Sequence, residues 1–388
     1  MIYLDANATT PVDPEVLEAM LPYLREGFAN PSAPYRAGRE ASKALEQGRA
    51  QVAELLAAEP PEIVFTSGGT ESDDAALRSA WDGWPEKRHL VTVQTEHSAI
   101  IESAKRWARS GGEVSWISVD SCGRANLDEL RAALRPGETS MVSVMWANNE
   151  TGVIAPIREI AELAHEAGAL MHTDASQVVG KVEELKTVAA SVDYLTLSGH
   201  KFHAPKGVGA LFVSRRVRFV PSLLGGGQEK GRRSGTENLP GIVAMGKAAV
   251  LAMGQGSLAP LRGMRDRVEA KIRAALPEAV IHALEIDRLV NTCSVCIPGV
   301  DAAGMLILLD QAGIACSAGS ACHSASIHPS HVLEAMGFDS AHASSTLRIS
   351  FSRMNTMGEA EAAGHAVVSA AARMREWASA EAGPVTMG

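Results

Sequence analysis

The stretch EIVFTSGGTESDD at residues 62–74 contains the unit that decides the fold. A run of β-branched and aromatic residues is followed by a turn through Gly68 and Gly69 and by a helical pattern that begins near Thr70. Short β-rich runs alternate with helical patterns in this way from residue 60 to about 215. The runs lie at 62–66, 89–93, 113–117, 140–145, 169–173, 194–197 and 208–213. This repetition predicts an α/β fold with a doubly wound, mainly parallel sheet that is covered by helices on both faces.

A smaller α/β domain is expected after the alternation ends. The patterns that follow are a glycine-rich basic segment at 224–235, an Ala-rich helix at 240–253, a hinge at 254–260, a helix to about 276, strands near 280–283 and 292–297, a helix at 301–311, a strand at 346–351 and a helix at 358–377. We expect a large domain at 16–257 and a small domain that combines 1–15 with 258–388.

The composition argues against several classes of protein. Apolar residues make up 46% and charged residues 21%, values typical of soluble globular proteins. The 45 acidic residues outnumber the 36 basic ones, so we expect no nucleic-acid partner. No apolar run reaches the roughly 18 residues of a membrane span, so we expect no membrane insertion. The five cysteines are an odd number without a secretory leader, which indicates reduced thiols in the cytoplasm.

The glycine turn at 66–72 is a candidate phosphate site. Backbone amides at a helix N-terminus, with hydroxyl groups beside them, form a cradle for an anion. An ordinary β–α turn that is capped by Thr70 would produce the same local pattern.

Two further strand ends carry candidate catalytic groups. Asp174 follows the run at 169–173, and Gln177 stands three residues later. A helix N-cap is the alternative role for Asp174. Lys201 follows the run at 194–197, where a lysine held against an apolar strand end can lose its proton and form a Schiff base. Taken alone, Lys201 would be read as a solvated loop cation.

Together, the cradle, the acid and the lysine meet the requirements of pyridoxal 5'-phosphate. The lysine binds the aldehyde, the amides hold the phosphate, and the acid faces the ring nitrogen. A carboxylate is needed there because it keeps the proton on the pyridinium, which makes the ring an electron sink. Asp174 is the natural partner for that nitrogen.

The chain resembles the cysteine desulfurases, fold-type I pyridoxal phosphate enzymes, along nearly its whole length. The motifs that carry the resemblance occur in the family's order: LDANATTP at 4–11, NPS at 30–32, SGGTES at 67–72, TEH at 95–97, ANNETG at 147–152, HTD at 172–174, SGHK at 198–201, GRRSGTEN at 231–238 and SAGSAC at 317–322. Two segments, VSVMW at 142–146 and GHKFHAPKGVG at 199–209, are most similar to the nitrogen-fixation, NifS-like type.

The resemblance implies roles for single residues. Lys201 would carry the cofactor, His97 would stack on its ring and transfer protons, and Asp174 and Gln177 would contact the ring. The other cofactor contacts would come from Gly69, Thr70, Asn149, Ser198, Gly199 and His200, with Thr236 reaching in from the second subunit of a homodimer. Asn149 and Arg348 would bind the substrate, Arg348 as a bidentate fork on the carboxylate. Alone, Arg348 would be read as a surface charge and His97 as a capping or core residue.

Cys322 separates a desulfurase from its transaminase relatives. It lies in a loop of small residues that has little packing reason to hold a thiol. Such a loop can swing and remain partly exposed, as a nucleophilic thiolate requires. The implied reaction removes sulfur from L-cysteine, gives alanine and leaves a persulfide on Cys322. The persulfide would pass to an iron-sulfur scaffold protein, with Cys322 as a transient cluster ligand, and nitrogenase-specific and general cluster assembly both stay open.

The other cysteines are not expected to act. Cys316 is interpreted as a buried strand residue, and Cys122 receives no role. Cys293 and Cys296 form a lone Cys-x-x-Cys on opposite faces of a strand, which argues against zinc.

Some positions depart from the family pattern: Tyr35, Asp74, His323 and His328. The histidines at 323, 328 and 331 are open to three readings, which are a metal site, a solvated loop beside a helix start, and groups that lower the pKa of the Cys322 thiol.

The rival functions are an aminotransferase, a selenocysteine lyase and a catalytically idle sulfur-transfer partner.

Overall fold

The computed structural model describes residues 1–318 and 330–381. Its centre is a seven-stranded sheet in the order β2-β8-β7-β6-β5-β3-β4. The strands are β2 (Ile63–Thr66), β3 (His89–Val93), β4 (Glu113–Ile117), β5 (Thr139–Ser143), β6 (Leu170–Asp174), β7 (Tyr194–Ser198) and β8 (Gly209–Val213). Only β8 runs antiparallel to its neighbours. The predicted mainly parallel sheet is therefore confirmed.

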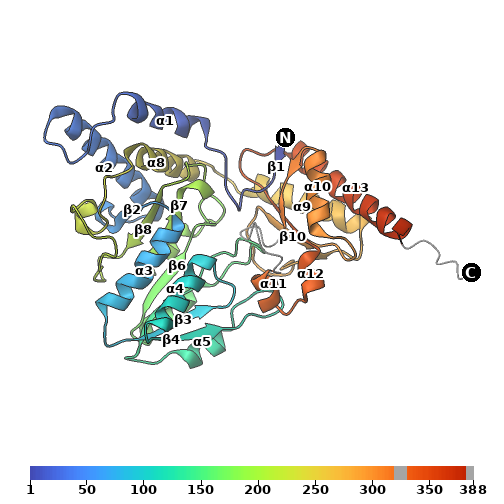
Figure 1. The fold of residues 1–388 in the computed structure, drawn as a ribbon, viewed down its shortest axis with the longest axis horizontal. Helices are drawn as coiled ribbons and strands as arrows, with labels where there is room; N and C mark the ends of the chain where they lie inside the picture. The colour runs from blue at the N-terminus through green and yellow to red at the C-terminus, as the bar shows by residue number, and fades with distance from the viewer. Residues whose placement is uncertain (319–329, 382–388) are drawn as a thin grey trace, which may run out of the picture.

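Helices cover both faces of this sheet, as Figure 1 shows. They are α1 (Pro14–Arg25), α2 (Arg36–Leu56), α3 (Gly69–Gly83), α4 (Ser98–Arg109), α5 (Leu127–Ala133), α6 (Ile157–Glu166), α7 (Leu185–Ala189) and α8 (Leu239–Met253). The alternation along β2 shows why two layers form. Ile63 and Phe65 pack in one core with α2 and α8, whereas Val64 packs in another core with α3 and α4. Burial on both faces explains why the strands read as continuous apolar runs.

A second core lies beside the large sheet, on the side of Figure 1 that holds both β1 and α13. Its elements are β1 (Ile2–Tyr3), α9 (Ala259–Ala275), β9 (Val280–Ile281), β10 (Thr292–Cys296), α10 (Ala302–Gln311), β11 (Ile314–Ala315), β12 (Ser317–Ala318), α11 (His331–Ala335), α12 (Ser340–Ser344), β13 (Thr346–Ser350) and α13 (Met357–Glu381). Four strands form an antiparallel sheet in the order β12-β13-β10-β9, and β1 pairs with β11 in parallel. Leu4 of the N-terminal segment is fully buried in this core.

Several boundaries differ from the sequence-based expectation for local reasons. β5 ends at Ser143, two residues before the predicted end, because the Met145 amide donates to the Glu96 carboxylate rather than to a strand. β9 stops at Ile281, and Ala283 has a positive φ of 56° that ends the extended run. The reading of Cys316 as a buried strand residue is wrong, since it is only partly buried and lies between β11 and β12.

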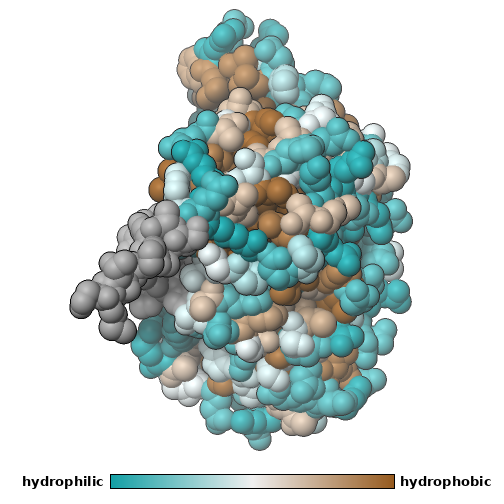
Figure 2. Space-filling model, turned by 90° about the vertical axis from the view of Figure 1, so that its right-hand side faces the viewer, coloured by the Kyte–Doolittle hydropathy of each residue, from teal (hydrophilic) through white to brown (hydrophobic). Residues whose placement is uncertain are grey.

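None of the described helices is long and apolar enough to cross a membrane. On the face in Figure 2, polar and apolar residues are interspersed, and apolar side chains gather only in small groups. Scattered apolar groups of this kind are normal on a protein surface.

Candidate active site

A cavity of about 520 Å³ lies where β2, β6 and β7 end and where β13 approaches the large sheet. Chain segments that follow parallel strands meet at this edge. Ten residues that the sequence singles out line the cavity: Gly69, Thr70, His97, Asn149, Asp174, Gln177, Ser198, His200, Lys201 and Arg348. The structure therefore brings most of the predicted site together from six separate parts of the chain.

The glycine turn after β2 leaves an open helix start. α3 begins at Gly69, and its N-cap Gly68 offers no side chain to the first amides. A Cβ at Gly69 would lie 3.1 Å from the Ser176 hydroxyl and 3.3 Å from Ser198 Cβ, so only glycine leaves the cradle open. The alternative of a turn capped by Thr70 is wrong, because Thr70 lies inside the helix.

Asp174 is the last residue of β6 and is buried beside the cavity. Its Oδ1 accepts a hydrogen bond of 2.8 Å from the Ser176 amide, and no α-helix begins there, so the N-cap alternative is wrong. Gln177 Nε2 donates to the Asn7 carbonyl at 3.0 Å, and Gln177 Oε1 accepts from Lys181 at 3.2 Å.

Lys201 ends a short 3₁₀ turn, Gly199–Lys201, that directly follows β7. Its Nζ donates to the backbone carbonyls of Asn7 at 2.6 Å and Ala8 at 2.9 Å. The solvated-cation reading is wrong, because this half-buried amine lines the cavity. Burial and neighbouring lysines, Lys201 first, lower the pKa of the adjacent His200 to about 4, so that ring is neutral at pH 7.

His97 both caps a helix and faces the cavity. It is the N-cap of α4, and its Nδ1 accepts a hydrogen bond from the Ala99 amide at 3.2 Å. Burial lowers the pKa of His97, against the opposing pull of Asp174, which favours the neutral ring. With Nδ1 as acceptor, the neutral ring carries its proton on Nε2.

Arg348 is fully buried in β13, so the surface-charge reading is wrong. Its NH2 group donates to Asp5 Oδ1 at 2.7 Å, and its NH1 group donates to the Asn149 carbonyl at 3.1 Å. Its Nε has no hydrogen-bond partner among the described residues. A buried guanidinium with a spare donor at a cavity wall is suited to a carboxylate ligand.

Comparison with known proteins identifies the family. The class-V aminotransferase family profile matches residues 2–362. The chain is 50% identical over 361 residues to cysteine desulfurase 2 of Trichormus variabilis, covering 92% of this chain and 90% of the relative. It is 44% identical over 362 residues to cysteine desulfurase NifS of Azotobacter vinelandii, covering 92% and 89%. This chain belongs to the cysteine desulfurase family, within the class-V aminotransferases.

A solved structure titled NifS-like protein agrees with this fold. It matches with a TM-score of 0.88 at 35% identity and covers 95% of this chain and 98% of its own. The family depends on pyridoxal 5'-phosphate. The cavity fits that cofactor, because it combines an open helix start for the phosphate, a buried carboxylate for the ring nitrogen and a lysine for the aldehyde.

The remaining predicted residues of this family member are not among the described residues that line the cavity. Gly199 is buried and does not line the cavity, and a Cβ there would meet the Val208 carbonyl at 2.9 Å. Thr236 is exposed and does not line the cavity of its own chain. Cys322, with His323 and His328, lies outside the described residues. His331 begins α11, and its Nε2 lies 2.9 Å from the Glu96 carbonyl.

Two departures from the family pattern, Asp74 and Tyr35, do not line the cavity. Asp74 pairs with Arg78 and Arg106 on the outer side of α3 and α4. Tyr35 is 56% exposed and precedes α2. Neither of these two residues alters the wall of the site.

Asn7 and Asp73 are among the residues of the cavity wall that sequence reasoning missed. Asn7 is buried, and its side chain donates hydrogen bonds to the Asn149 carbonyl and to the Thr292 hydroxyl. The Asn7 backbone carbonyl accepts a hydrogen bond from Lys201 Nζ. Its motif at 4–11 was the only available signal. Asp73 is fully buried, and its Oδ1 lies 3.6 Å from His172 Nε2 without a hydrogen-bond partner in the part of the chain that the structure describes. Burial, and next Asp174, raise the pKa of Asp73 well above its usual range.

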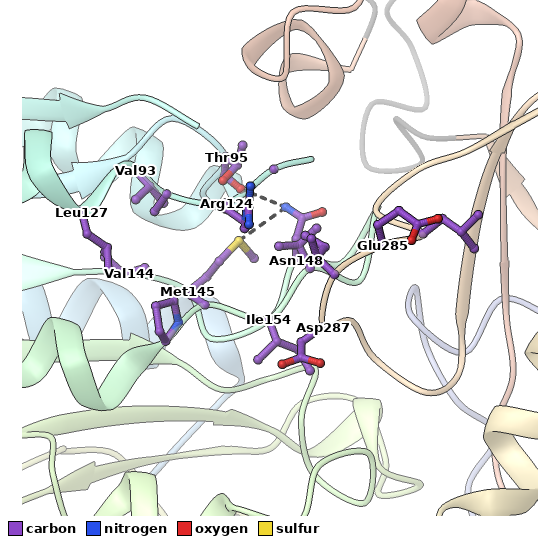
Figure 3. Close-up of a pocket in the computed structure, with 17 residues that line it drawn as sticks. Val93, Thr95, Arg124, Leu127, Val144, Met145, Asn148, Ile154, Glu285 and Asp287 are labelled. Carbon is purple, nitrogen blue, oxygen red and sulfur yellow. Dashed lines mark hydrogen bonds between the residues drawn. The ribbon is translucent and has the colours of Figure 1, made fainter. Parts of the chain in front are cut away.

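A second cavity, of about 710 Å³, adjoins the first at Met145, which lines both. Figure 3 shows it between the ends of β3 and β5 and a segment that carries Glu285 and Asp287. Asn148 donates to the Thr95 carbonyl and to the Met145 sulfur there. No residue predicted to bind cofactor or substrate lines this larger cavity, so the smaller one is the candidate active site.

Proposed function

We propose that this chain is a pyridoxal phosphate-dependent cysteine desulfurase, a transferase that moves sulfur from L-cysteine to Cys322 and leaves alanine. One observation carries the proposal. Lys201, Asp174 and Arg348 converge on one cavity in a chain whose relatives are named cysteine desulfurases. A lysine and an acid suit the cofactor, and the buried arginine suits an amino-acid carboxylate.

The cofactor, when bound, supplies an electron sink that weakens the bonds at the α-carbon of an amino acid. Asp174 would hold the proton on the ring nitrogen, and His97 would stack on the ring and exchange protons through its Nε2. The amides of Gly69 and Thr70, with Ser198 and the neutral His200, would bind the phosphate, and Gly199 would support the turn that carries Ser198 and His200. Gln177 would bind the ring hydroxyl.

The substrate is oriented by Arg348 and Asn149. The spare Nε of Arg348 and its NH2 group present a fork to the carboxylate, beside the Asp5 contact. The Asn149 carbonyl accepts hydrogen bonds from Arg348 and Asn7, which would hold Asn149 at the cavity wall beside this fork. Lys201 would hold the cofactor until the substrate amine takes its place, and the released Lys201 amine would then move the proton at the substrate α-carbon.

Sulfur transfer is assigned to Cys322. Its thiolate attacks the substrate sulfur, so a sulfur–sulfur bond forms as the carbon–sulfur bond breaks. The electron pair of the broken bond stays with carbon, which takes up a proton and leaves as alanine. The persulfide then passes to an iron-sulfur scaffold protein, where Cys322 is a transient cluster ligand, or is reduced to sulfide by a thiol.

The assembly we propose is a cytoplasmic homodimer in which Thr236 of each subunit completes the other phosphate site. The exposure of Thr236, outside its own cavity, supports this arrangement. We also propose a small domain of 1–15 and 258–388 and a large domain of 16–257. The separate apolar core that joins Leu4 to residues from 261 to 371 supports that division.

The test is the release of alanine and sulfide from L-cysteine in the presence of a thiol reductant. We expect equal amounts from the intact protein and neither product from Cys322→Ala, since no other thiol lines the described cavity wall. Persistence of sulfide release in Cys322→Ala would contradict the assignment. Conversion of L-cysteine to its keto acid, with the sulfur retained and no alanine formed, would indicate an aminotransferase, and faster turnover of selenocysteine would indicate a lyase for that substrate.

A further inference from the structure

Lys181 is a buried amine that the proposed chemistry does not use. It lies in the turn after β6 and is only 6% exposed. Its Nζ donates to Gln177 Oε1 at 3.2 Å. Within the described residues no carboxylate lies close enough to form an ion pair with it. Buried lysines are ordinarily paired with an acid, so this position calls for a reason.

A chain of hydrogen bonds joins Lys181 to Lys201. Gln177 accepts from Lys181 with its oxygen and donates to the Asn7 carbonyl with its nitrogen, at 3.0 Å. The same carbonyl accepts from Lys201 Nζ at 2.6 Å. Both amines also line a small cavity of about 20 Å³ with Thr10 and Ser352, which is enough space for one water molecule.

The charged and titratable groups around Lys181 are almost all basic. Lys201, His200 and His203 face it from the segment after β7, Arg348 faces it from β13, and Arg353, which pairs with Asp13, closes the small cavity. The pKa of Lys181 is lowered to about 7, mainly by burial and next by the charges of Lys201 and Arg348. Its charge therefore changes within the working range of pH.

We propose that Lys181 is a positioning residue that fixes the amide of Gln177 and, through its charge, sets the proton affinity of the Lys201 nitrogen. This inference rests on the proposed role of Lys201. A protonated Lys181 disfavours a second positive charge at Lys201, whereas a neutral Lys181 permits it. Because the two amines interact, their protons are released in coupled steps.

The test follows the visible absorbance of bound pyridoxal phosphate as a function of pH. The intact protein should give a broadened transition, because two coupled amines titrate. Lys181→Met removes the charge and should give a single-proton curve moved upward by about one pH unit, and Lys181→Arg keeps the charge and should move the curve downward. Lys247→Met in α8, which removes an amine paired with Glu15 of α1, should leave the curve unchanged.

Opposite shifts of the absorbance curve in the two Lys181 variants support the proposal, because the shift caused by a packing defect would not change direction with the charge of the side chain. Curves that coincide with the intact protein, or that move in the same direction, overturn it. Loss of the absorbance in Lys201→Ala tests the proposed function separately, so the two failures are distinguishable.

A second measurement needs no Lys181 variant and no cofactor. The cofactor-free protein is methylated with formaldehyde and a mild reductant across a pH series, and labelling of the peptide with Lys181 is quantified by mass spectrometry. We expect half-maximal labelling near pH 7, moving upward in Lys201→Ala because a neighbouring cation is lost. Half-maximal labelling near the ordinary lysine pKa, unchanged in Lys201→Ala, would contradict the inference.

Discussion

His97 combines two functions that the sequence presents as alternatives. Its Nδ1 caps α4, and its ring still lines the active-site cavity. Capping fixes the tautomer, because an accepting Nδ1 leaves the proton of the neutral ring on Nε2. Burial lowers its pKa, which favours the neutral ring. The tautomer of His97 is thus set by the helix that His97 caps.

Buried histidines also make stability depend on pH. His172 in β6 is fully buried, and burial lowers its pKa to about 4 from an ordinary 6.5. Between these values the unfolded chain binds the proton and the folded chain does not, so this contribution to stability is lost as pH falls through the window. We expect His172 to contribute about 3 kcal/mol to the difference between pH 6.5 and 4.

The measurement is urea unfolding at several pH values, for the intact protein and for His172→Gln. The variant should unfold more easily at neutral pH, since it lacks the contact of 2.8 Å to Ser143, but it should lose less stability on acidification. An equally steep acid dependence in both proteins would show that other groups control it.

At the level of elements, the glycine turn depends on the close approach of two strands. A Cβ at Gly209, the first residue of β8, would lie 2.6 Å from the Gly68 backbone at the start of the cradle. Backbone atoms cannot move aside as easily as the end of a flexible side chain, so a side chain at Gly209 would displace the turn. The shape of the cradle is thus determined jointly by β2 and by β8, its antiparallel neighbour in the sheet.

We expect Gly209→Ala to weaken binding of pyridoxal phosphate by about tenfold or more, because displacement of the turn by a few tenths of an ångström misaligns its amides. The measurement is a fluorescence titration of the cofactor-free protein. Gly83→Ala, at the other end of α3, is the control. Its Cβ would meet only Val220 at an ordinary 3.5 Å, so affinity should not change.

A buried ion pair anchors the segment that leads to Thr236. Arg49 of α2 binds Glu229 through two hydrogen bonds of 2.6 and 2.8 Å, and Glu229 also accepts from the Phe65 amide in β2. Loss of one charge leaves the other buried without a partner. We expect Glu229→Gln to lower the free energy of unfolding by about 3 kcal/mol.

Chemical denaturation of matched variants checks this value. Glu40→Gln breaks the pair of Arg36 and Glu40, whose side chains are 86% and 63% exposed, and should cost less than about 0.5 kcal/mol. If both substitutions had the same small effect, the buried pair would not be an anchor.

At the scale of the whole molecule, the site is assembled from parts that no single element contains. The N-terminal segment supplies the Asn7 carbonyl to Lys201, and Asp5 binds Arg348 in β13. The large sheet and the small sheet therefore meet at the cavity. The proposed homodimer adds a third contributor, the partner copy of Thr236.

Complementation tests this assembly. Lys201→Ala and Thr236→Ala are each expected to abolish or strongly reduce activity at limiting cofactor. If Thr236 acts across subunits, a mixed dimer of the two variants contains one fully intact site, so coexpression should restore about a quarter of the intact activity. Absence of any recovery in isolated mixed dimers would place Thr236 in its own subunit's site or outside the chemistry.

The amino-acid sequence by itself determined the order and type of the elements and the chemistry of the site. The alternation from residue 60 to 215 predicted all seven strands of the large sheet, because strand and helix periods are local properties. A lysine, an acid and a glycine turn at strand ends predicted the cofactor, because few chemistries need those three groups together.

Only the tertiary structure decided which atoms meet. The bond from Lys201 to the Asn7 carbonyl spans 194 positions, and the bond from Arg348 to Asp5 spans 343. No local pattern encodes such distances, so Asn7 and Asp73 were missed and Arg348 could not be told from a surface charge. The burial of Lys181 beside Lys201 was likewise decided by packing, since burial and like charge control its pKa and neither is a property of the local sequence.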